Sequence, residues 1–87
     1  MLKLAQTRTF KKSLKRYRHN KSVLAELKTI VKMLVNEKPI PAEYLDHGLK
    51  GKHIGIRELH LKPDTLLLYK HKEKITLVAI GSHSEIF

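Results

Sequence analysis

The sequence predicts an α+β domain in which a two-helix hairpin packs on a small sheet. Apolar residues recur at helical spacing twice in the first half of the chain. The second half holds three short apolar runs that are separated by tight turns, as in an antiparallel meander. The expected element order is therefore β-α-α-β-β-β, and the length of 87 residues indicates a single domain over residues 1–87.

The first expected element is a short strand at residues 2–4, where apolar and charged side chains alternate. The first helix follows it, because apolar residues recur at spacings of four and three positions and basic residues fill the other faces. Its apolar positions are Phe10, Leu14 and Tyr17. Thr7 or Thr9 is expected to cap its start, and His19 and Asn20 are expected to end it.

The second helix is predicted to begin at Ser22 as N-cap and to stop before Pro39, since proline cannot continue a helix. Its apolar stripe contains Val23, Leu27, Ile30 and Leu34. A stripe at this spacing is typical of a core-facing helix. Only about three polar residues join the two helices, which favours an antiparallel hairpin.

The rest of the chain is predicted as a loop over residues 39–52 and then three strands. The strands are expected at residues 53–61, 65–69 and 75–80. The segment "KPD" supplies the first turn between them and "HKEK" the second. The middle strand is apolar on both faces, as a central strand should be.

The composition is strongly basic. Eighteen Lys and Arg face eight Asp and Glu, which gives a net charge of +10. Such an excess indicates a polyanionic partner, namely nucleic acid, a ribosome or an acidic protein. The alternative is a basic protein that has no polyanionic partner. No cysteine, signal peptide or membrane-length apolar segment occurs, so we expect a cytoplasmic protein with no membrane partner.

Known cofactor motifs are missing from the sequence. It contains no Walker A loop, dinucleotide fingerprint or zinc signature, so no cofactor is expected. The segment "GLKG" (48–51) matches the GxxG loop of RNA-binding KH domains, but that loop lies between two helices and this one precedes a strand. A turn that needs positive φ is the simpler interpretation.

Three histidines and an aspartate fall near predicted strand ends, where a meander could bring them together. They are His47, His60, Asp64 and His83. A single histidine is more often a surface or hydrogen-bonded residue, and His19, His53 and His71 are assigned to that class. A metal bound by the three clustered histidines is geometrically possible, although nothing in the sequence requires it.

Convergent histidines on a basic domain suit the cleavage of RNA by its own 2′-hydroxyl. A base must remove the 2′-proton, an acid must protonate the leaving 5′-oxygen, and cations must stabilise the charged phosphorane. An imidazole, with an ordinary pKa of about 6.5, can serve as base or acid without a metal.

Three segments in order, "YLDHGLKG", "RELHLKPDTLLLYK" and "GSHSEIF", resemble the YafQ-like branch of the RelE superfamily. Their shared patterns are D-H-x-L-x-G, R-[DE]-x-H-x-x-P-D and G-[ST]-H-x-x-x-F. The resemblance implies a toxin of a type II toxin–antitoxin pair that cleaves mRNA in the ribosomal A site. It also implies the RelE-like fold and an acidic antitoxin as partner.

The resemblance carries the catalytic roles to His47, His60, Asp64 and His83, with His47 as the favoured base and His83 as the favoured acid. The residues expected to contact the substrate are Phe87, Arg57, Lys50, Lys52 and Glu58. Two other functions explain the charge but leave the acid–base set unexplained. One is a basic RNA- or ribosome-binding module without catalysis, and the other is a toxin-like protein that only binds an antitoxin-type partner.

Overall fold

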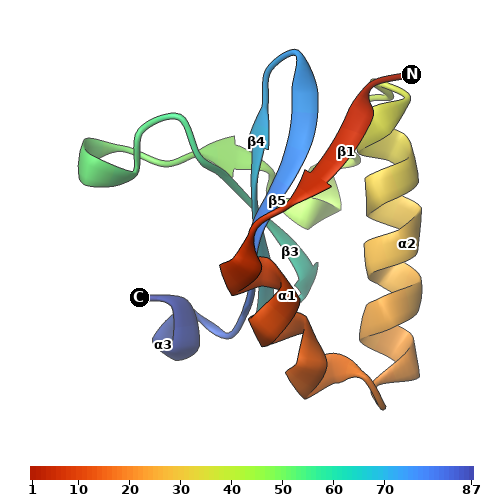
Figure 1. Ribbon diagram of the computed structural model, residues 1–87, viewed down its shortest axis with the longest axis vertical. Helices are drawn as coiled ribbons and strands as arrows, with labels where there is room; N and C mark the ends of the chain where they lie inside the picture. The colour runs from red at the N-terminus through yellow and green to blue at the C-terminus, as the bar shows by residue number, and fades with distance from the viewer.

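The computed structural model describes residues 1–87, which form one five-stranded sheet with the two N-terminal helices on one face (Figure 1). The strand order is β1-β5-β4-β3-β2. The strands are β1 (Lys3–Gln6), β2 (His47–Gly48), β3 (Arg57–Lys62), β4 (Thr65–His71) and β5 (Lys74–Gly81). Strands β2 to β5 pair antiparallel, whereas β1 pairs parallel with β5. The predicted α+β class and C-terminal meander are therefore confirmed.

Two helices, α1 (Arg8–Leu14) and α2 (Lys21–Val35), pack on the same face of the sheet, and a 3₁₀ turn, η1 (Lys15–Tyr17), extends α1 (Figure 1). Thr7 caps α1, because its hydroxyl accepts from the Phe10 backbone N–H at 3.0 Å. The same hydroxyl donates to the Val78 carbonyl at 2.7 Å and so fixes the start of α1 to β5.

The predicted start of the second helix was wrong by two residues. Asn20, and not Ser22, is the N-cap of α2, since its side-chain oxygen accepts from the Val23 N–H at 3.1 Å. Asparagine is among the strongest N-cap residues, so the residue predicted to end the first helix instead begins the second.

The main core lies between the helices and the sheet. Its most deeply buried members include Phe10 and Ile30 from the helices and Leu59, Leu67 and Ile80 from the strands. Burying one such aliphatic side chain contributes roughly 1.5–3 kcal/mol. Because side chains alternate along a strand, the residues between these strand positions point to the opposite side.

We call that opposite side the outer face. From the pairing register, it bears Glu58, His60, Leu66, Leu68 and Ala79. Leu66 and Leu68 are buried although they lie outside the main core. The prediction that the middle strand is apolar on both faces is therefore confirmed.

The region before β3 differs from the predicted loop and strand. It contains two 3₁₀ turns, η2 (Ala42–Tyr44) and η3 (Gly51–His53), with β2 between them. Strand β3 begins at Arg57, four residues later than predicted, and Ile54 is 80% exposed. Two glycines at positive φ turn the chain away from an extended path: Gly51, the first residue of η3, at 67°, and Gly55, after η3, at 92°.

The C-terminal tail is folded back on the sheet as a short helix, α3 (His83–Ile86). Ser82 and Glu85 form a reciprocal capping box at its start. Gly81 is the last residue of β5, and its role is to leave space for α3. A Cβ atom there would lie 3.1 Å from Glu85 Oε1 and 3.4 Å from Ile86 Cγ1.

No helix combines the length and the apolar content that crossing a bilayer would demand.

Candidate active site

The outer face is flanked by two segments from distant parts of the chain. The η3 loop and α3 both project to the side of the sheet away from α2 (Figure 1). His60 on β3 pairs with Leu66 on β4, and Leu66 pairs with Gly81 on β5. His60 and Gly81 are therefore two strand spacings apart, or about 10 Å, and α3 begins just beyond Gly81.

His47 lies on β2 opposite Glu58 of β3 and is oriented through both ring nitrogens. Its Nε2 lies 3.2 Å from Glu58 Oε2, and its Nδ1 lies 2.7 Å from the carbonyl oxygen of Leu45. The Glu58 side chain is largely buried, whereas half of the His47 side chain is exposed. The ring is thus fixed in place while it remains accessible from solvent.

His60 lies two residues after Glu58 and shares its side of β3, so His47, Glu58 and His60 form one group on the outer face. The His60 ring nitrogen Nδ1 is 3.4 Å from the Pro63 carbonyl oxygen. Asp64 follows in the exposed turn between β3 and β4. The turn predicted at "KPD" thus places Asp64 at the end of the sheet where His60 lies.

The terminal Phe87 ring contacts both His83 of α3 and His53 of η3. The ring centroid of Phe87 is 5.0 Å from that of His83 and 5.4 Å from that of His53. The second contact is edge-on, a favoured geometry for aromatic pairs. His53 was assigned to the ordinary surface histidines, and no local pattern in the sequence indicates this contact across 34 positions.

Contacts from η1 fix α3 beside the sheet. Glu85 Oε1 accepts from the Ser82 backbone N–H at 2.7 Å, and the Glu85 backbone N–H donates to Ser82 Oγ at 3.3 Å. The hydrogen bond from the Ser82 backbone lowers the pKa of the Glu85 carboxyl. Arg16 Nη1 lies 3.5 Å from the same carboxylate, and the Tyr17 hydroxyl donates to it at 3.5 Å. Partial burial and the nearby Glu85 raise the pKa of Tyr17.

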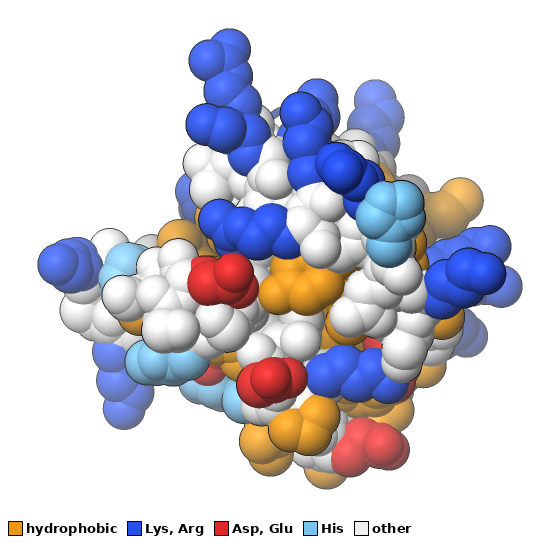
Figure 2. Space-filling view, turned by 90° about the horizontal axis from the view of Figure 1, so that it is seen from below, with side chains coloured by type: hydrophobic (Ala, Val, Ile, Leu, Met, Phe, Trp, Pro, Cys, Tyr) orange, Lys and Arg blue, Asp and Glu red, His pale blue; other side chains and the backbone are white.

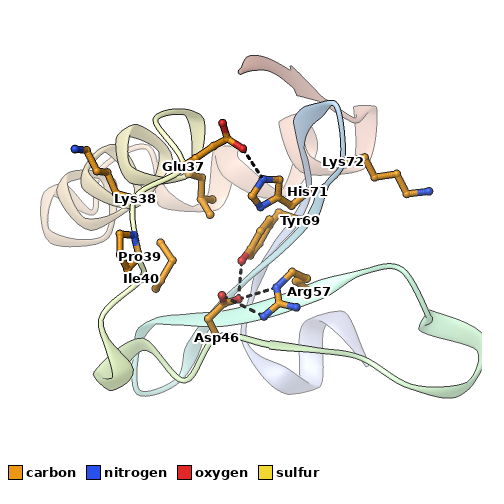
Figure 3. A pocket seen from close by; sticks show the side chains of 10 residues that line it. Glu37, Lys38, Pro39, Ile40, Asp46, Arg57, Tyr69, His71 and Lys72 are labelled. Carbon is orange, nitrogen blue, oxygen red and sulfur yellow. Dashed lines mark hydrogen bonds and ion pairs between the residues drawn. The ribbon is translucent and has the colours of Figure 1, made fainter. Parts of the chain in front are cut away.

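Arg57 is not among the residues gathered on the outer face. It precedes Glu58, so its side chain lies on the helix side of the sheet, where Nη2 is 3.3 Å from Asp46 Oδ2 (Figure 3). The Tyr69 hydroxyl donates to Asp46 Oδ1 at 2.6 Å. Hydrogen bonding to Asp46 raises the pKa of Arg57, and burial, together with the same carboxylate, raises that of Tyr69 above its ordinary range.

These three side chains lie at one wall of a cavity of about 640 Å³ between the end of α2 and the β4–β5 turn (Figure 3). Glu37 and His71 face each other across its rim, with 3.8 Å between Oε1 and Nε2. The cavity therefore lies on the helix side of the sheet, which we also describe as behind the sheet, and the His47 ring lies on the opposite, outer face.

Basic side chains are concentrated on the first helix and its extension. Lys and Arg side chains crowd the upper and right-hand edges of the molecule in the view from below (Figure 2). On α1 and η1 they are Arg8, Lys11, Lys12, Lys15 and Arg16. Lys50 and Lys52 add exposed charge to the η3 loop. A polyanion that contacted both the basic residues of α1 and η1 and the lysines of the η3 loop would pass beside α3 and the outer face.

The outer-face residues do not form a metal site in this structure. No group of three or more His, Cys, Asp or Glu residues has an arrangement that could hold a metal ion. What the arrangement offers is a set of imidazoles and carboxylates at one end of the sheet, flanked by lysines.

Comparisons with known proteins agree with the sequence pattern. The family model described as "Bacterial toxin of type II toxin-antitoxin system, YafQ" matches residues 2–87. The mRNA interferase toxin YafQ of Escherichia coli K12 is 38% identical over 64 residues, which cover 71% of this chain and 70% of that protein.

Solved structures of similar proteins share the whole fold. YafQ in the E. coli DinJ–YafQ complex has a TM-score of 0.88 at 29% identity and covers 100% of this chain and 99% of its own. A metal-bound toxin from Helicobacter pylori has a TM-score of 0.90 at 42% identity, with both chains fully covered. The chain therefore belongs to the YafQ family of bacterial toxins of type II toxin–antitoxin systems.

Proposed function

We propose that the protein is a ribosome-dependent endoribonuclease that cleaves mRNA in the ribosomal A site, and that it acts in the cytoplasm. The observation that carries this proposal is the outer-face group of His47, Glu58 and His60 beside the α3 that carries His83. Imidazoles can move the protons of this reaction at neutral pH. Membership of a family whose relatives are named mRNA interferases supports the same function.

In the proposed reaction, the His47 imidazole removes the proton of the 2′-hydroxyl, and the 2′-oxygen attacks the adjacent phosphorus. The bond from phosphorus to the 5′-oxygen breaks, and His83 donates a proton to that oxygen. The products are a 2′,3′-cyclic phosphate and a 5′-hydroxyl. Because a carbonyl oxygen can only accept, Nδ1 of His47 donates to Leu45, and Nε2 is the atom that takes the proton. In the proposed reaction the 2′-hydroxyl enters between Nε2 and Glu58, and the Glu58 carboxylate then stabilises the imidazolium.

The remaining site residues have supporting roles in the proposal. Lys50 and Lys52 stabilise the charge that develops on the phosphate, since both are exposed on the η3 loop. His60 and Asp64 act on the phosphate and the leaving group from the β3–β4 end. Arg57 was expected to contact the substrate, but its pairing with Asp46 behind the sheet favours a role in holding the β2 segment. No metal is required in this scheme.

Cleavage should occur mainly on translating ribosomes. The outer face is an open surface whose His47 and His83 are exposed, so it offers little to orient a flexible strand, and correct placement is worth several orders of magnitude in rate. Primer extension on a translated message should show cuts at A-site codons after addition of the protein. Equal cutting of the same RNA without ribosomes would refute the dependence on translation.

An acidic antitoxin should bind this basic toxin and block the outer face. The net charge of +10 favours capture of an acidic protein, and E. coli YafQ is known in complex with DinJ. Adding the cognate acidic protein to the primer-extension assay should therefore abolish the cuts. Cuts that persist at saturating concentrations of the acidic partner would contradict this part of the proposal.

A purely RNA-binding function, which the basic α1 would also serve, predicts no cuts with or without the acidic partner.

Phe87 is proposed to stack on a base of the bound mRNA, because the residue is 46% exposed and its ring lies beside His83. Base stacking on an aromatic ring is worth about 1–3 kcal/mol, or roughly 5- to 150-fold in binding. Phe87→Trp should retain cleavage, and Phe87→Leu should lose it by about that factor with little change in melting temperature. Full cleavage by Phe87→Leu, or a loss explained by a lowered melting temperature, would remove the stacking role.

A further inference from the structure

We propose that Asp46 is a positioning residue, which is anchored behind the sheet by Arg57 and Tyr69 and thereby fixes the His47 ring on the outer face. This inference rests on the proposed function, because it assigns His47 to the reaction. It gives a physical role to Asp46, which precedes His47 in the sequence and takes no part in the proposed reaction itself.

The segment that carries His47 has little else to hold it in place. Strand β2 contains only two residues, both exposed, and it pairs with β3 alone at the edge of the sheet. Leu45, just before it, has a left-handed backbone with φ of 53°, an uncommon conformation for a residue with a branched side chain. Such a conformation persists only where neighbouring contacts determine it.

Asp46 supplies contacts to two strands of the sheet. Its Oδ1 accepts from the Tyr69 hydroxyl at 2.6 Å, and Arg57 donates to both carboxylate oxygens at 3.3 Å (Figure 3). Tyr69 is only 1% exposed and lies in the central strand β4, so its hydroxyl is a rigid point of attachment. Two-point binding by a guanidinium also fixes the orientation of the carboxylate.

The anchor acts on His47 because adjacent residues of an extended segment point to opposite faces. With Asp46 fixed on the helix side, His47 must point to the outer face, where Glu58 and the Leu45 carbonyl complete its orientation. Loss of the anchor leaves the segment with the two backbone pairs of β2 and the hydrogen bond from the Leu49 N–H to the Ile56 carbonyl, and so frees Asp46 and His47 to shift. A displacement of about 1 Å at a reacting group can cost up to about 100-fold in rate.

Tyr69→Phe is the sharpest test, since it keeps the buried ring and removes only the hydroxyl that binds Asp46. We expect a 10- to 100-fold lower rate of single-turnover mRNA cleavage on ribosomes, with ribosome affinity unchanged. Tyr44→Phe is a matched control, because it removes a tyrosine–carboxylate hydrogen bond of 3.0 Å, to Glu26, from the same loop. It should leave the rate within about twofold, and an equal loss in both variants would overturn the specific role of Asp46.

A double-mutant cycle separates positioning from general stability. In a His47→Ala background, Tyr69→Phe should cause no further loss of cleavage, because the group that it positions is already gone. A loss of the same size in both backgrounds would overturn the proposal.

NMR of the His47 ring provides a readout that does not depend on cleavage. Tyr69→Phe should shift the His47 ring signals, whereas Tyr44→Phe should not. Unchanged His47 signals in Tyr69→Phe would overturn the anchor. If the wild-type protein failed to cut translated mRNA, the proposed function would fall, and the NMR result would still decide whether Asp46 orients His47.

Discussion

Replacing His83 or His47 with alanine is expected to lower the rate of mRNA cleavage about 10²- to 10⁴-fold in each case, the usual contribution of a general acid or base. Both side chains are exposed, so their loss removes no core packing and the fold should persist. Single-turnover primer extension gives the rate, and circular dichroism reports the fold. His60→Ala and Asp64→Ala should also lower the rate, since both lie at the same end of the sheet.

The pH dependence of the rate separates the roles of the two histidines. A base must be unprotonated and an acid protonated before reaction, so wild-type cleavage should show a bell-shaped pH profile. In His47→Ala, the residual cleavage rate should no longer increase with pH on the acidic side of the profile. In His83→Ala, the residual rate should no longer decrease with pH on the basic side. The opposite pattern would exchange the two roles.

Two other histidines serve as controls for these substitutions. His71 lies at the rim of the cavity behind the sheet, and His19 lies in the connection before α2. His19→Ala and His71→Ala should therefore keep cleavage within about twofold of the wild type. Full cleavage by the outer-face variants, or unfolding of those variants, would show that the site has been placed wrongly.

Gly81→Val should abolish cleavage as thoroughly as His83→Ala, although residue 81 takes no part in the chemistry. Even a Cβ atom at this position would lie 3.1–3.4 Å from atoms of Glu85 and Ile86, and valine adds two further carbons. The substitution should therefore displace α3 and with it His83. Because β5 is otherwise unchanged and valine favours strands, the sheet should remain intact.

The displacement of α3 can be observed directly. Gly81→Val should separate the Phe87 ring from His53 of η3, and the loss of NMR contacts between these two rings would report it. The contact between His83 and Phe87 lies within α3 and should move with it. Thr76→Val, which places valine in the same strand away from α3, should keep both the ring contacts and cleavage. Normal cleavage by Gly81→Val would show that the docked position of α3 is not needed for the reaction.

The sequence by itself determined the features that depend on neighbouring residues. Helical spacing marked both helices, because a helix repeats its buried face every three to four residues. Pro63 and Asp64 marked the turn between β3 and β4. The start of α3 is also encoded by neighbouring residues, since Ser82 and Glu85 form a capping box, although no helix was predicted after residue 80.

Only the tertiary structure decided which candidate residues meet. Arg57 and Glu58 are adjacent, yet one binds Asp46 behind the sheet and the other binds His47 on the outer face. The register of β3 makes that choice, and a shift of one residue would reverse it. The contact of His53 with Phe87 likewise joins segments 34 positions apart. Local spacing carries no information about such contacts, because they depend on how the glycine-rich η3 loop and α3 fold toward the same end of the sheet.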